Sequence, residues 1–134
     1  MGIARLQTQS VLVSWGVGPS KINDARLVTS ELIADAVRES YASEQPPTYA
    51  ELAAIATLTL TLRPVSLGVA IEVFDRNPNR RRPASPENTP KSKYGRLLLN
   101  GLSTDWGAVH VVEKKRYVGQ MVWALVNCRA MWNQ

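Results

Sequence analysis

Residues 57–75 read TLTLTLRPVSLGVAIEVFD, and this stretch decides the class of fold. Threonine and leucine alternate strictly over Thr57–Arg63, which is the period of a strand with one buried face. Every second residue is again apolar over Leu67–Val73, after turn-forming residues at Pro64–Ser66. The pattern therefore predicts two antiparallel strands joined as a β-hairpin in the middle of the chain.

Two helices are predicted before this hairpin. Helical spacing of apolar residues runs over Ile3–Trp15, and Gly16 and Gly18 end that run. Ser20 is a candidate N-cap for a longer helix that reaches about Ser40. The apolar residues of this second helix fall on one half of its surface, which we expect to face the core. They are Ile22, Ala25, Val28, Leu32, Ile33, Ala36 and Val37.

A third helix and two more strands are predicted after the hairpin. Tyr94–Ser103 contains a compact run of leucines that suits a buried helix, and Trp106–Glu113 and Gly119–Asn127 are the predicted strands. The charged turn Glu113–Arg116 joins these strands, whereas residues 42–56 stay unassigned apart from a possible short helix. This order predicts an α+β fold, a two-layer sandwich of a mostly antiparallel mixed sheet with helices on one face.

Length and composition indicate one domain. The chain has 134 residues, of which 45% are hydrophobic, enough for one packed core over residues 1–134. The sequence has neither a signal pattern nor an apolar run long enough to span a bilayer, so we expect a cytoplasmic protein without membrane contact. A single cysteine, Cys128, and a single histidine, His110, are too few for a disulfide or a Cys/His metal site.

Positive charge is concentrated in one segment. The chain carries a net charge of +5, and the segment Arg76–Arg96 holds seven basic residues against one acidic residue, Glu87, a local charge of +6. Four prolines in this segment oppose a regular helix or central strand across most of it. We therefore expect a long cationic loop at about 76–94.

Acidic residues gather at one edge of the second helix. Asp24, Glu31, Asp35 and Glu39 lie within about 80° of one another on a helical projection. Glu31 and Asp35 are four residues apart, so their carboxylates are neighbours and favour a cation between them. Mg²⁺ carrying nucleotide phosphates suits this arrangement. The alternative is a solvated acidic helix edge, which spacing alone favours.

Two further features suggest a ligand site. Asp75 ends an apolar strand and opens into a loop, where a carboxylate can accept a hydrogen bond from an exocyclic amine. Gly95 begins the third predicted helix, whose N-terminal N–H groups favour a phosphate. Taken singly, Asp75 also fits a turn-initiating Asp-x-Asn-Pro, and Gly95 fits an ordinary hinge between loop and helix.

These features occur in a familiar order. The series comprises Ser30–Arg38, the strand ending at Asp75 and the Gly95–Leu98 helix entry, and tryptophan–glycine pairs occur at Trp15–Gly16 and Trp106–Gly107. From about residue 4 to residue 126 the chain resembles the GHKL (histidine-kinase-like, Bergerat-fold) ATPases. The resemblance is to the small actinobacterial ATP-binding regulators related to anti-sigma-factor serine kinases.

The resemblance implies roles for individual residues. Glu31 would be the catalytic general base, Asp35 the Mg²⁺ ligand, and Asp75 the adenine-binding carboxylate. Asn77 and the second glycine box, which contains Gly95, Arg96 and Leu97, complete the implied cofactor-binding set, and the 76–94 loop would be the phosphate-covering lid. Asp35 replaces the family's usual asparagine, and Asn77 and Leu97 replace glycines.

The first functional hypothesis is therefore a regulatory protein that binds ATP and Mg²⁺. It would phosphorylate a serine or threonine of an antagonist protein and bind a sigma factor or a similar transcription regulator. The alternative keeps the fold without turnover, as a protein-binding module that could form a homodimer through its first helix and an exposed sheet face. Nucleic-acid binding through Arg80–Arg82 ranks lowest, because aromatic residues are not interleaved with the basic ones.

The remaining candidate residues favour structural roles. His110 lies between valines in a strand without a nucleophile–base spacing, so we interpret it as a packing residue. Cys128 is interpreted as a small buried hydrophobe. The tryptophans lie at the edges of predicted elements and are interpreted as packing residues.

Overall fold

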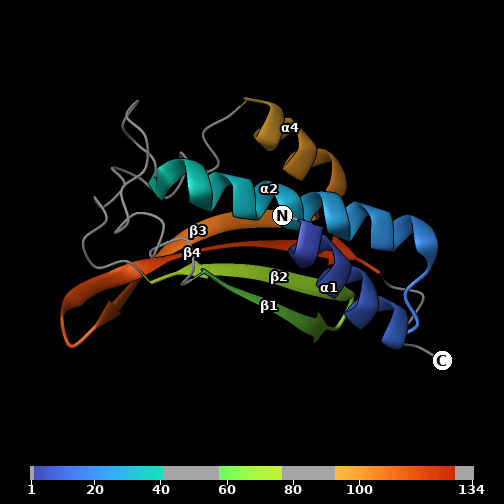
Figure 1. Cartoon of the computed structure of the whole chain (residues 1–134), viewed down its shortest axis with the longest axis horizontal. Coiled ribbons are helices and arrows are strands. Elements are labelled where there is room, and N and C mark those ends of the chain that lie inside the picture. The colour runs from blue at the N-terminus through green and yellow to red at the C-terminus, as the bar shows by residue number, and fades with distance from the viewer. Residues whose placement is uncertain (1, 41–57, 77–92, 129–134) are drawn as a thin grey trace.

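The computed structural model describes residues 2–40, 58–76 and 93–128, with the side chains of 37–40 and 93 excepted. These residues form an α+β fold of three helices and a four-stranded antiparallel sheet. The helices lie together on one side of the sheet (Figure 1). In chain order the elements are α1 (Gly2–Ser14), α2 (Pro19–Ser40), β1 (Leu58–Val65), β2 (Gly68–Asp75), α4 (Lys93–Leu102), β3 (Asp105–Glu113) and β4 (Arg116–Asn127).

The predicted hairpin is confirmed as β1 and β2. Leu58 pairs with Asp75 at one end of the hairpin and Val65 with Gly68 at the other. The full strand order is β1-β2-β4-β3, and every pair of neighbours is antiparallel. The prediction of a mostly antiparallel sheet therefore holds for the described strands, although these contain no parallel pair. The last strand also begins at Arg116, three residues before the predicted Gly119.

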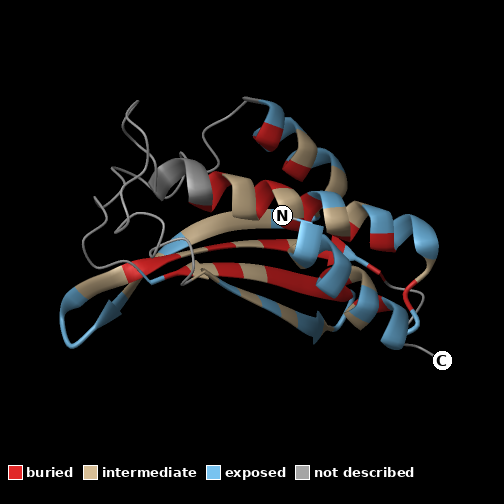
Figure 2. Cartoon of the chain, in the orientation of Figure 1, coloured by how far each residue is buried: buried red, intermediate tan, exposed pale blue. Residues whose placement is uncertain are grey.

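The core lies between the sheet and α2. The helix residues Ile22, Ala25, Val28, Leu32 and Ala36 are buried, as the helical pattern predicts, and Ile33 is partly buried. Alternate residues of β2 and β4 form the sheet side of this core. Val69, Ile71 and Val73 of β2 are buried, and they pair with the buried residues Val126, Ala124 and Val122 of β4. Figure 2 shows this buried band along α2 and the two central strands.

The first helix packs on the second around a polar contact. The side chains of Thr8 and Thr29 are both fully buried, and their Oγ1 atoms lie 3.3 Å apart. The Thr8 hydroxyl also donates to the backbone carbonyl of Ala4 at 2.9 Å. Two buried hydroxyls are thus satisfied inside an otherwise apolar contact, which fixes α1 against α2.

The C-terminal end of β4 closes the core. Cys128 is 2% exposed, belongs to the core cluster and donates its backbone N–H to Leu67, so the interpretation of Cys128 as a buried hydrophobe is confirmed. Burial raises the pKa of the Cys128 thiol above its ordinary value. Within the described residues, no helix combines the length and the apolarity that a membrane crossing requires. The segment 42–56, which the sequence leaves unassigned, lies outside the described residues.

Candidate functional site

The two central acids of α2 are buried. Glu31 is 8% exposed and Asp35 is 1% exposed, so the interpretation as a solvated acidic helix edge is wrong for both. Asp24 behaves differently, because its carboxylate is partly exposed and lies 3.8 Å from the ammonium of Lys21. Burying a carboxylate is costly unless charge or hydrogen bonds compensate it. Glu31 and Asp35 therefore make the C-terminal half of α2 the polar part of the buried surface of this helix.

A row of polar residues crosses the sheet beneath that half of α2. Asp75 at the end of β2 pairs with Gln120 of β4, and Gln120 pairs with His110 of β3. Directly opposite residues of antiparallel strands point to the same face with Cβ atoms about 4.5–5.5 Å apart. Asp75 shares its face with Val73 and the other core residues of β2, so this row faces the helices. Asp75 and Gln120 are 1% and 2% exposed.

A β-bulge brings an aromatic residue onto the same face. The register between β3 and β4 shifts at Val111 and Val112, so that Val111 pairs with Gly119 but Val112 pairs with Tyr117. The extra residue of β4 reverses the alternation beyond it, and Tyr117 therefore points to the helix side. Its ring meets the ring of His110 edge-on, with centroids 5.6 Å apart and planes 89° apart. The bulge thus adds an aromatic pair to the end of the polar row.

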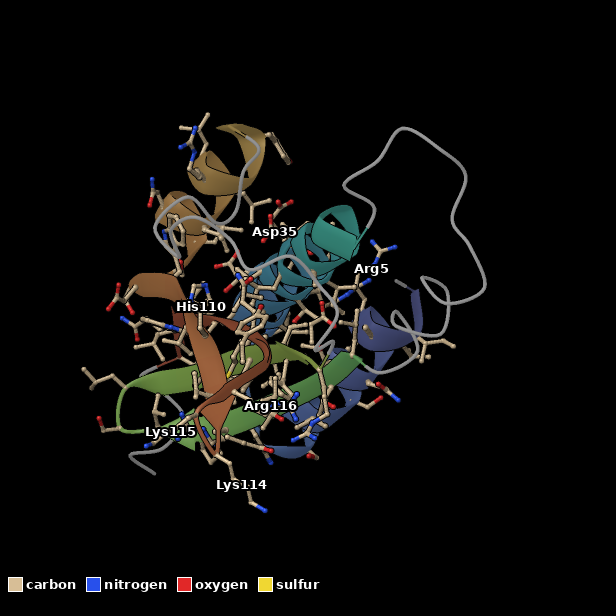
Figure 3. All side chains as sticks on the ribbon, turned by 90° about the vertical axis from the view of Figure 1, so that its left-hand side faces the viewer. Arg5, Asp35, His110, Lys114, Lys115 and Arg116 are labelled. Atoms are coloured by element: carbon tan, nitrogen blue, oxygen red, sulfur yellow. The ribbon has the colours of Figure 1, made fainter. Side chains whose placement is uncertain are left out.

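The helix acids and the sheet row lie at the same end of the molecule. The C-terminal half of α2 extends over the end of β2 that carries Asp75 (Figure 1). Figure 3 looks at this end and shows Asp35 on α2 and His110 on β3 on facing sides of the helix and sheet layers. Side-chain polar atoms of the following residues there are closed off from solvent: Asp35, Asp75, His110, Tyr117 and Gln120. We call these five residues and Glu31 the polar row site.

A glycine lets the strands meet closely beside Asp75. A Cβ atom placed on Gly119 would collide with the backbone carbonyl oxygen of Asp75 and would lie 3.1 Å from the Cα of Arg76. The absence of a side chain at Gly119 is therefore a condition for the close approach of β4 to the end of β2. This approach fixes the position of the Asp75 backbone.

The second glycine box is described in part. Gly95 is buried in the first turn of α4, whereas Arg96 and Leu97 are exposed, Leu97 to 61%. Asn77 and residues 77–92 of the expected lid lie outside the described residues. Arg76, the first residue of that loop, donates a 2.7 Å hydrogen bond to the Glu113 carboxylate at the end of β3.

The described residues hold no ready-made metal cage, since no three of their His, Cys, Asp or Glu side chains are grouped to hold a metal ion. Mg²⁺ in nucleotide sites takes one or two carboxylates and completes its octahedron with phosphate oxygens and waters. The carboxylate of Asp35 is chemically suited to be one such ligand of Mg²⁺. It could hold the ion only together with phosphate oxygens as further ligands.

An apolar pocket lies at the opposite end of the sheet. It has a volume of about 280 Å³ and is lined by Val65, Ser66, Leu67, Gly68, Thr104, Leu125, Val126 and Asn127. These residues surround the β1–β2 turn, far along the strands from the Asp75 end. The pocket shares no residue with the polar row site.

The sequence indicated only part of the polar row site. Glu31, Asp35 and Asp75 were candidates, whereas Gln120 and Tyr117 were not, and His110 was interpreted as a packing residue. The edge-on contact with Tyr117 fits that interpretation, but the register also places His110 in line with Asp75. Alternation from the predicted strand Gly119–Asn127 indicates that Gln120 shares a face with Val122 and Ala124, which is the signal that could have identified it.

Comparison of the chain with protein-family models, curated proteins and solved structures found no match.

Proposed function

We propose that this chain is a nucleotide-binding regulatory protein with a Bergerat-like fold, which takes ATP and Mg²⁺ at the polar row site. One observation carries the proposal. The carboxylates of Glu31 and Asp35 on α2 and the carboxylate at the end of β2 are all buried, and their elements overlap at one end of the molecule. The order of these groups along the chain is the order that the sequence resemblance implies.

The proposed roles follow from hydrogen-bonding chemistry. Asp75 is held at a strand end with little freedom, and a carboxylate there accepts from the exocyclic amine of adenine. Gln120, directly opposite, has an amide that can both donate to and accept from the same ring. The N-terminal turn of α4, with Gly95 buried within it, favours phosphate oxygens.

The proposed reaction is phosphoryl transfer to a serine or threonine of a protein antagonist. The hydroxyl oxygen bonds to the γ-phosphorus, the bond from that phosphorus to the β–γ bridging oxygen breaks, and ADP leaves. Glu31 accepts the hydroxyl proton as general base, and its burial shields this proton transfer from bulk water. When bound, Mg²⁺ would be held by Asp35 and phosphate oxygens, and it would neutralise part of the phosphate charge.

Calorimetric titration tests the binding part of this proposal. We expect wild-type protein to bind Mg·ATP and Mg·ADP, and Asp75→Asn to bind both roughly 10- to 100-fold more weakly, because one charge-assisted hydrogen bond is lost. Glu72→Gln is the matched control, since Glu72 lies three residues earlier on the same strand, faces the other side and pairs with Arg63. It should bind like wild type.

Two outcomes would contradict the proposal. One is no heat of binding at about 1 mM nucleotide, a concentration that detects even weak binding. The other is unchanged affinity in Asp75→Asn when circular dichroism shows the variant to be folded. Glu31→Gln separates binding from transfer, because it should keep ATP affinity and lose phosphorylation of an antagonist.

Exposed apolar side chains on α1 favour a second candidate function, which is protein binding without ATP turnover. Ile3, Leu6 and Val13 of α1 are 74%, 63% and 58% exposed, and their spacing places them on one stripe of the helix. A row of exposed apolar side chains of this kind marks contact surfaces in many proteins. We propose a second copy of the chain as the occupant of this stripe, since identical stripes can pack against each other about a two-fold axis.

Sedimentation velocity tests the second candidate. We expect wild type to show a concentration-dependent dimer and Leu6→Glu to be monomeric, because a buried charge opposes the contact. Leu97→Glu is the control, as Leu97 is similarly exposed on α4, and it should dimerise like wild type. A monomeric wild type, or equal loss in both variants, would exclude the α1 stripe as a dimer contact.

A further inference from the structure

The β3–β4 hairpin extends beyond the rest of the sheet. Pairing between β2 and β4 reaches only as far as Asp75 and Gln120, yet β4 begins at Arg116 and continues to pair with β3 up to Glu113. Three residues of β4, Arg116–Val118, therefore lie beyond the end of β2 and the neighbouring Arg76, a length of about 10 Å at the rise of an antiparallel strand. Figure 1 shows this two-stranded ribbon projecting from the sheet.

The tip of this ribbon is strongly basic. Lys114, Lys115 and Arg116 are all exposed, and none of them makes an ion pair with another described residue. The acid of the tip, Glu113, is engaged by the guanidinium of Arg76 at 2.7 Å. Figure 3, which faces this end, shows the side chain of Lys114 pointing away from the body of the protein. The tip therefore presents three positive charges on a narrow projection.

The turn itself holds these charges in an uncommon backbone conformation. Lys114 and Lys115 have φ angles of 51° and 63°, both in the left-handed region. A two-residue hairpin turn with two positive φ angles strongly prefers Asn-Gly, because other residues place Cβ too close to the backbone. Residues kept in such conformations concentrate at functional positions. Two lysines in this turn thus point to a use for their charge.

We propose that the β3–β4 ribbon binds the major groove of double-stranded DNA, with its tip cations contacting phosphates. Two antiparallel strands lie about 4.8 Å apart and enter a groove about 12 Å wide and 8.5 Å deep. The major groove of double-stranded RNA is too narrow for such a ribbon. The tip residues Glu113–Arg116 have no apolar side chain, and the neighbouring Val112, 55% exposed, is a single valine with too little apolar area to anchor the tip in a bilayer, so a membrane is the less favoured partner.

DNA binding goes beyond nucleotide binding and uses the ribbon tip, which adjoins the polar row site at Tyr117 and His110. It also differs from the nucleic-acid hypothesis based on Arg80–Arg82, which lie outside the described residues. Phosphate contacts release counterions, so the affinity must fall as salt rises, with a logarithmic slope of about −0.9 for each contact. The three tip cations therefore predict a slope of at least about −2.7.

The test is fluorescence anisotropy of a labelled DNA duplex between about 50 and 200 mM salt. The key variant is Lys114→Asn with Lys115→Gly, which removes two charges but supplies the residues that this turn prefers. We expect its DNA affinity to fall about tenfold or more and its salt slope to become shallower by about 1.8. Its melting temperature should rise by a few degrees, about 4 °C, because the turn is relieved of strain.

A matched control removes two charges from the opposite end. Lys21→Gln with Arg63→Gln leaves the ribbon intact, both side chains being about half exposed, and it should bind DNA like wild type. The proposal is overturned if wild type does not bind the duplex at low salt, or if the control loses as much affinity as the ribbon variant. Equal affinity for double-stranded RNA would also overturn it, as would binding to anionic vesicles or polyglutamate in place of DNA. A ribbon variant that binds DNA like wild type would overturn it as well, and this result is expected if Arg80–Arg82 carry the binding.

Discussion

Leu32→Ala should lower the free energy of unfolding by roughly 2–5 kcal/mol, the range found when a buried leucine is reduced to alanine. Leu32 is 2% exposed and lies in the core between α2 and the central strands. The loss combines the transfer free energy of the removed carbons with the cavity that they leave. Urea unfolding followed by tryptophan fluorescence measures this loss of free energy, because Trp15 directly follows α1, Trp106 lies in β3 and Trp123 lies in β4.

Leu27→Ala is the control on the same helix. Leu27 is 39% exposed, so its truncation should cost less than about 1 kcal/mol. Equal losses in the two variants would mean that α2 does not use the Leu32 side as its buried face. Since Glu31 is adjacent to Leu32 and Asp35 lies near it one turn further on, such a result would also remove the basis for placing these acids in the protein interior.

Gly119→Ala is the second substitution with a large expected effect, a loss of about 3 kcal/mol in the free energy of unfolding. The new methyl group would collide with the carbonyl oxygen of Asp75, a backbone atom that cannot rotate away. Relief requires β4 to move from the end of β2, which breaks the pairing that sets the polar row. We therefore expect a lower midpoint in urea, and weaker nucleotide binding in the fraction that remains folded.

Gly101→Ala is the matched control for that substitution. A Cβ on Gly101 meets nothing within 4 Å, and the residue lies exposed in α4. Alanine there should raise stability by about 0.5–1 kcal/mol, because it favours the helix and restricts the unfolded chain. If Gly119→Ala were as stable as wild type, the close approach of β4 to Asp75 would have to be absent in solution.

Local periodicity was sufficient to predict the type and the order of the elements that the structure describes. Alternation over residues 57–73 predicts β1 and β2, and the helical pattern after Ser20 predicts which residues of α2 are buried. The predicted end of the first strand, just before Pro64, was wrong. Proline is tolerated in an edge strand, so β1 continues to Val65 where a turn was expected. Similarly, the turn residues Lys114 and Lys115 are not the glycine or asparagine that usually mark a two-residue hairpin turn. The start of β4 at Arg116 could therefore not be predicted from the sequence.

The candidate site was less accessible to sequence reasoning because it depends on strand register. Residue type and helical spacing single out Glu31, Asp35 and Asp75, but they cannot tell whether the helix acids face water or the protein interior. Burial in the structure decides that question. The alignment of His110 and Gln120 with Asp75 requires knowing that β4 lies between β2 and β3, a long-range pairing that no local pattern encodes.

The bulge at Val111 and Val112 also limits how the ribbon can change in length. Because successive side chains alternate between faces, adding or removing residues in pairs keeps every ring and carboxylate on its present side. Inserting one residue into β3 opposite the extra residue of β4 would instead restore regular alternation, turn Tyr117 to the uncovered side and separate it from His110. Related chains with one more residue in β3 at this point should therefore lack this aromatic contact.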